Sequence, residues 1–95
     1  MSERNAYQQK LEAQLNEWQA KIKQLEAKAS QASADAKIEY NEQLQELKSK
    51  QAAAQSKLEE LKGASNEAWD DIKLGVEEAW DNLSHSISDA AARFK

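Results

Sequence analysis

The only histidine of the chain, His85, shares one side of a predicted helix with two aspartates. Asp81 and Asp89 stand four residues before and after it, so all three side chains project from one face. Imidazole and carboxylate groups are ligands for divalent metals, and this spacing could hold one. A solvated polar face explains the same residues more simply, since such side chains are ordinarily exposed. We therefore predict no metal site and no cofactor.

Other patterns that carry chemistry are missing from the sequence. The chain has no cysteine and only two glycines, so it offers no thiolate ligands and no glycine-rich phosphate loop. No serine or threonine is placed with a base as a catalytic nucleophile would be. Slender helices also rarely form the concave pocket that an enzyme needs. We expect a protein that is not an enzyme.

The composition predicts an all-α fold. Proline is absent, 32% of the 95 residues are charged, and Ala, Gln, Glu, Lys and Leu dominate. The first residues are polar and unlike a signal peptide, and no apolar run has the length of a membrane span, so we expect a cytoplasmic protein. The net charge of −4 disfavours nucleic acid and anionic membranes as partners.

Residues 1–62 have the apolar spacing of a coiled coil. Apolar residues follow one another at alternate steps of four and three, which places them in one seam of a long helix. The seam continues on alanines through residues 27–37, where serines could also cap a new helix, and we favour one unbroken helix. The predicted oligomer seam consists of Leu11, Leu15, Trp18, Ile22 and Leu25.

A tight turn is predicted at residues 63–65. Gly63 fits the left-handed position that ends many helices, and Ser65 fits the N-cap of the next one. The charge also changes here, from ten acids and ten bases before Gly63 to seven acids and three bases after it. We expect residues 66–95 to form a shorter amphipathic helix that folds back on the first.

This return helix repeats itself every eleven residues, with Trp69 and Trp80 in the same slot. Eleven residues make about three turns, so the apolar stripe stays straight along the helix. The opposite side is acidic, with Leu74 as its one apolar residue. The predicted core of the helical hairpin comprises Tyr40, Leu44, Leu47, Leu58, Trp69, Ile72, Val76, Trp80, Leu83 and Ile87.

The lengths of the two predicted helices have a consequence for assembly. A return helix of residues 66–95 covers only the nearer half of a helix over residues 1–62, which leaves the N-terminal seam bare. A second copy could cover that seam, most simply in a homodimer, parallel or antiparallel. If the chain instead breaks near residues 30–35, three helices of similar length could close into a monomeric three-helix bundle.

The segment LEELKGAS is followed by AWDDIKLGVEEAWDNLSHSISDAAARFK, in which AWD is repeated. In these segments the chain resembles a family of small bacterial coiled-coil proteins described as uncharacterised or as stress-response proteins, and the resemblance extends over nearly the whole chain. It implies a soluble oligomer associated with stress, without catalytic residues.

We predict a non-enzymatic, self-associating coiled-coil scaffold or adaptor, which could also bind a partner protein. The alternative is an amphipathic protein of lipid surfaces, because eleven-residue repeats occur in lipid-binding helices. The acidic return helix argues against this alternative, since an anionic membrane would repel it.

Overall fold

The computed structural model describes residues 3–94 of the chain and is all-α over these residues. The helices contain 28, 30 and 28 residues. At 1.5 Å per residue, each is roughly 42–45 Å long. They are α1 (Glu3–Ser30), α2 (Ala34–Gly63) and α3 (Asn66–Arg93).

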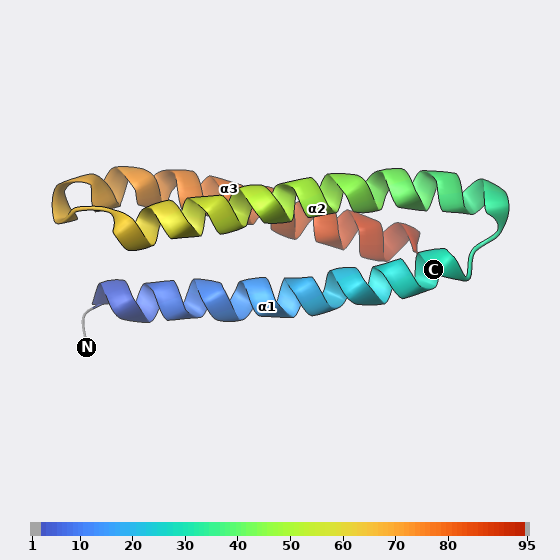
Figure 1. Cartoon of the computed structure of the whole chain (residues 1–95), viewed down its shortest axis with the longest axis horizontal. Coiled ribbons are helices and arrows are strands. Elements are labelled where there is room, and N and C mark those ends of the chain that lie inside the picture. The colour runs from blue at the N-terminus through green and yellow to red at the C-terminus, as the bar shows by residue number, and fades with distance from the viewer. Residues whose placement is uncertain (1–2, 95) are drawn as a thin grey trace.

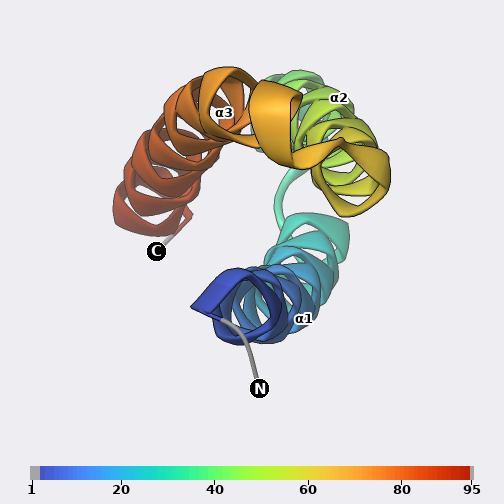
Figure 2. The same cartoon turned by 90° about the vertical axis from the view of Figure 1, so that its left-hand side faces the viewer.

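The three helices lie along one long axis, and the chain direction alternates from each helix to the next (Figure 1). α2 lies antiparallel to α1, and α3 lies antiparallel to α2. The molecule is elongated along the helices and measures 51 × 20 × 17 Å. Viewed along the helices, α1, α2 and α3 stand at three corners around a shared interior (Figure 2). α2 packs against both other helices, and α1 and α3 also touch.

The predicted unbroken helix over residues 1–62 is wrong, because the chain turns at residues 31–33. Ser33 caps the new helix: its side chain accepts a hydrogen bond from the backbone N–H of Ala36 at 3.4 Å. Serine at this position competes with helix continuation, which the alanine seam alone does not reveal. The structure thus has three helices of similar length in place of a long one and a short one.

The second turn follows Gly63. Ser65 is the N-cap of α3 and accepts a hydrogen bond from the N–H of Ala68 at 3.3 Å, as the sequence predicts. The left-handed conformation predicted for Gly63 is wrong, since φ is positive at no residue between 3 and 94. α2 instead ends at Gly63 and is followed by an extended Ala64, whose N–H donates to the carbonyl oxygen of Leu61 at 3.2 Å.

A single apolar core receives side chains from all three helices. No charged or polar residue of the described chain is buried within it. None of the helices within residues 3–94 combines the length and apolar character that a bilayer span requires. The buried residues are Leu11, Leu15, Ile22, Leu25, Ala29, Leu44, Leu47, Ala54, Leu58, Leu61, Val76, Trp80, Leu83, Ile87, Ala90 and Phe94.

Candidate functional site

The residues predicted to form an oligomer seam lie in the interior of a single chain. Leu11, Leu15, Ile22 and Leu25 are buried, and Trp18 is half-buried against the same core. Because α1 folds back on α2, its apolar face is covered without a second copy. The argument for a dimer that rested on a bare N-terminal seam therefore does not apply to this closed form.

The residues predicted for the hairpin core also face the interior. The structure buries Leu44, Leu47, Leu58, Val76, Trp80, Leu83 and Ile87, and it leaves Tyr40, Trp69 and Ile72 partly buried against them. The eleven-residue repeat thus corresponds to the face of α3 that packs on the other two helices.

His85 and its two aspartates do not form a cluster. His85 Nδ1 lies 3.8 Å from an Asp81 carboxylate oxygen, with about three quarters of each side chain exposed (76% and 72%). Within residues 3–94, no three histidine, aspartate or glutamate side chains are grouped so that they could hold a metal ion. The trio is a solvated surface of α3.

Arg4, at the start of α1, makes hydrogen bonds to the end of α2 and the start of α3. One of its guanidinium nitrogens donates to the carbonyl oxygens of Leu61 (3.2 Å), Lys62 (3.4 Å) and Ala64. The other donates to the side-chain oxygen of Asn66 at 3.1 Å. Leu61 and Lys62 lie in the last turn of α2 and Ala64 follows it, so Arg4 caps the end of α2 from a different helix.

An aromatic cluster extends this contact between α1 and α3. The Tyr7 and Trp69 rings meet edge to face, with centroids 5.7 Å apart. Lys73 Nζ stands 4.7 Å from the centroid of Tyr7 and 5.4 Å from that of Trp69, and the Arg4 guanidinium lies 5.7 Å from the Trp69 ring. Cations over aromatic faces at these distances are attracted by the ring quadrupole. We call Arg4, Tyr7, Trp69 and Lys73 the aromatic clasp.

The Tyr7 hydroxyl donates to a carboxylate oxygen of Glu77 at 3.4 Å. Burial raises the pKa of Tyr7 above its ordinary value of 10.0, and the charge and hydrogen bond of Glu77 raise it further. Both effects favour the neutral phenol. The raised pKa therefore extends the pH range over which Tyr7 stays protonated.

Two cavities lie beside the clasp, between α1 and α3. One, of about 350 Å³, borders the clasp itself. The other, of about 360 Å³, continues along the helices past Trp18 and Trp80, whose ring centroids are 6.1 Å apart. The indole N–H groups of Trp69 and Trp80 are buried without a hydrogen-bond partner in the described residues. These contacts are those of a packed helix interface.

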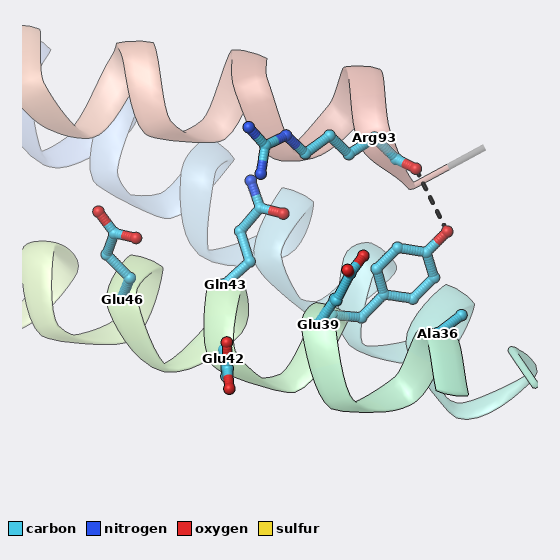
Figure 3. Close-up of a pocket in the computed structure, with 7 residues that line it drawn as sticks. Ala36, Glu39, Glu42, Gln43, Glu46 and Arg93 are labelled. Carbon is cyan, nitrogen blue, oxygen red and sulfur yellow. Dashed lines mark hydrogen bonds between the residues drawn. The ribbon is translucent and has the colours of Figure 1, made fainter. Parts of the chain in front are cut away.

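A wider hollow of about 600 Å³ lies between α2 and the end of α3 (Figure 3). The Tyr40 hydroxyl closes one side by donating to the backbone oxygen of Arg93 at 3.2 Å. Three exposed carboxylates, from Glu39, Glu42 and Glu46, follow one another along α2 at its rim. Positive charge already stands beside these carboxylates, since Arg93 lines the hollow and Lys50 pairs with Glu46 at 3.1 Å.

The outward surface of α3 has a clearer organisation, centred on Leu74. This side chain is 67% exposed. Its helical neighbours three, four and seven residues away in both directions are all acidic and all exposed. We call this surface, with Leu74 and its six neighbours, the Leu74 face: Glu67, Asp70, Asp71, Leu74, Glu77, Glu78 and Asp81.

The other large exposed apolar residue is Ile38 of α2, at 64%. Its surroundings are mostly uncharged: among its neighbours at the same helical spacings, only Asp35 and Glu42 are acidic. Of the two large exposed apolar residues in the described chain, only Leu74 has acidic residues at all six of these spacings.

Arg4 and Lys73 were not predicted as site residues. A signal for Arg4 does exist, because it stands three residues before Tyr7 and seven before Leu11, in step with the apolar seam. A cation at a seam position indicates a side chain that points toward a neighbouring helix. No spacing in the sequence, however, identifies the carbonyl groups that it reaches.

Comparisons with models of protein families, with curated proteins and with solved structures each found no match.

Proposed function

We propose that the chain is a non-enzymatic, self-associating helical adaptor, which binds a partner protein through the Leu74 face. One observation carries the binding role: Leu74 is 67% exposed at the centre of an acidic surface. Exposed apolar residues rimmed by charge are typical of protein interfaces.

The chemistry of this surface indicates the kind of partner. Burying the Leu74 side chain would contribute roughly 1.5–3 kcal/mol, whereas the surrounding carboxylates would select positive charge and accelerate encounter. An amphipathic helix with an apolar stripe flanked by lysine or arginine satisfies both requirements. We therefore propose a basic amphipathic helix as the partner element.

Two synthetic peptides test the binding role. The first is a short helical peptide with a stripe of leucines flanked by lysines, and the second keeps the lysines but replaces the leucines with serine. We expect the first to bind at least about tenfold more tightly by calorimetry, because only it buries Leu74. Leu74→Ser should remove that difference and leave a salt-sensitive interaction common to both peptides.

Ile38→Ser is the matched control, since Ile38 is exposed to a similar extent but lacks the acidic ring. It should leave the preference for the leucine-containing peptide unchanged. Equal affinity of the two peptides for the unmodified chain, or an Ile38→Ser effect as large as that of Leu74→Ser, would contradict the proposal.

Self-association has its own test, the molar mass in solution. Light scattering on a sizing column across a wide concentration range should show mass rising from one chain to two. A constant mass of one chain would refute this part of the proposal and leave the binding role standing. The association with stress is supported by the family resemblance alone.

The wavelength of tryptophan emission distinguishes the lipid-surface alternative from the adaptor. Trp69 and Trp80 already contact the core, so lipid binding would require the helices to open and these side chains to insert. We expect no blue shift when anionic or zwitterionic vesicles are added. A blue shift would favour the lipid surface over the adaptor.

A further inference from the structure

The turn at residues 31–33 lacks the residues that forbid a helix. Residues 27–37 contain neither glycine nor proline, and Ala29, Ala32 and Ala36 carry the seam spacing through the turn. Ser33 has φ −63° and ψ 161°, so its φ is already helical and only its ψ differs. One side-chain cap on the N–H of Ala36 favours the turn locally. The alternative to this turn is a straight helix.

Straightening the turn would carry α1 away from its own α2 and α3. The vacated surface would then expose the core residues that α1 covers, and the same residues of α1 in a second copy would fit it. The interface needs no new complementarity, because every contact of α1 already exists within one chain.

The ion pairs between α1 and α2 show how two such copies would align. Glu12 pairs with Lys62, and Glu26 pairs with Lys48 at 2.9 Å. The midpoint of both pairs is residue 37. If two straight helices were aligned antiparallel about residue 37, Glu12 and Glu26 of each chain would therefore face Lys62 and Lys48 of the other. Each ion pair would then form twice in the dimer, once from each chain. Ala36 would lie beside the symmetry axis, where a small side chain permits close approach.

We propose, building on the self-association proposed above, that the partner in the dimer is the α1 helix of a second copy. In this exchanged dimer, residues 3–63 of each chain form one helix, and each α1 packs on the α2 and α3 of the other chain. The aromatic clasp forms between chains, with Arg4 of one copy capping α2 of the other. High protein concentration during folding favours this form, since exchange replaces an intramolecular contact with an intermolecular one.

Ala34→Pro separates the two forms. Ala34 is the first residue of α2, where proline fits, and the extended Ser33 before it has the conformation that proline requires of its neighbour. In a continuous helix the same proline would remove a hydrogen bond and clash with the preceding turn. We expect this variant to keep the closed monomer and to lower the dimerisation constant by about four orders of magnitude.

Ser33→Ala should act in the opposite direction. It removes the side-chain cap that stabilises the turn of the monomer. Because two monomers form one dimer, the lost stability of the monomer counts twice in the dimerisation equilibrium. The dimerisation constant should rise by about thirtyfold. Both variants and the unmodified chain are unfolded in guanidinium, refolded at low and high protein concentration, and then measured by light scattering on a sizing column.

A cross-link identifies the chain that supplies α1. The sequence has no cysteine, so Glu12→Cys combined with Lys62→Cys provides the only thiols. A short bis-maleimide reagent applied to the isolated dimer should join two chains, and applied to the monomer it should join positions within one chain. Addition of Ala34→Pro to this double variant should leave only the intramolecular product.

The outcomes distinguish the exchange from self-association in general. A dimer that persists in Ala34→Pro, or that cross-links only within chains, overturns the exchange but leaves self-association intact. An unmodified chain that stays monomeric after refolding at high concentration overturns both. A dimer that disappears in Ala34→Pro and cross-links between chains supports the exchange.

Discussion

A guanidinium nitrogen of Arg4, in the first turn of α1, donates to the backbone oxygen of Leu61 in the last turn of α2, 3.2 Å away and 57 residues along the chain. The same nitrogen reaches the carbonyl groups of Lys62 and Ala64. The position of α1 is therefore tied to the turn that joins the other two helices. The contact is polar and lies beside the buried side chain of Leu61, at the edge of the apolar core.

Arg4→Ala should destabilise the closed form by about 1–2 kcal/mol, because it removes several charge-assisted hydrogen bonds at a partly buried site. Urea unfolding followed by circular dichroism measures the loss. Arg4→Lys retains the charge without the planar fork and should recover less than half of it. Identical unfolding midpoints for all three chains would show that the crossing contact contributes nothing.

Two replacements of Trp80 separate the contribution of its packing to stability from the cost of its buried indole N–H. Trp80 is 7% exposed, and its indole N–H has no partner in the described residues. Trp80→Ala should cost about 3–5 kcal/mol through lost contacts and a cavity. Trp80→Phe should cost only about 1 kcal/mol, because it keeps an aromatic ring and removes a buried donor without a partner. Equal costs for the two variants in chemical unfolding would argue against this division.

The pH dependence of Tyr7 follows from its raised pKa. Well below pH 10 the phenol is neutral in both the folded and unfolded chain and contributes no pH dependence. As the pH rises above 10.0, the unfolded chain loses this proton first, so folding stability falls until the folded pKa is passed. Tyr7→Phe should remove this part of the alkaline loss of stability.

Absorbance of the phenolate at alkaline pH locates the Tyr7 pKa directly. The chain has two tyrosines, so the titration is made in a Tyr40→Phe background. Glu77→Gln should move the pKa of Tyr7 back toward its ordinary value, because it removes a negative charge and weakens the acceptor. An unchanged titration curve would show that Glu77 does not act on Tyr7.

Gly75→Ala should stabilise the fold. Gly75 lies within α3, where glycine is less favourable than alanine by about 0.5–1 kcal/mol. A methyl group there would meet the Lys57 side chain no closer than 3.9 Å, an ordinary contact. A higher thermal midpoint is therefore expected, and a lower one would mean that α2 and α3 approach more closely than this.

The sequence predicts the helical structure and its buried faces because both depend on local spacing. The apolar positions of α3, from Trp69 through Ile87, recur at helical intervals that only one face can satisfy. The cap at Ser65 is also local, since the turn, the serine and the first acid of α3 stand within the five residues 63–67. Such features need no knowledge of what packs where.

The break at residues 31–33 could not be predicted in this way. The alanine seam favours continuation and the Ser33 cap favours a turn, and the two differ by only about 1 kcal/mol. Which one prevails depends on what covers the apolar face of α1, a tertiary property. The contacts of Arg4 could not be predicted from the sequence for a similar reason, since they form only when α1 packs against the turn between α2 and α3.

The alternating directions of the three helices determine how the molecule would respond to a pulling force. α1 begins at the end that holds the second turn, and α3 finishes toward the opposite end (Figure 1). Tension applied between residues 3 and 94 would draw α1 and α3 apart along their own lengths. The interfaces would then slide in shear, with many side chains yielding together, and would not peel open one turn at a time. A short rod of this kind can transmit force along its axis while its sides remain free for binding.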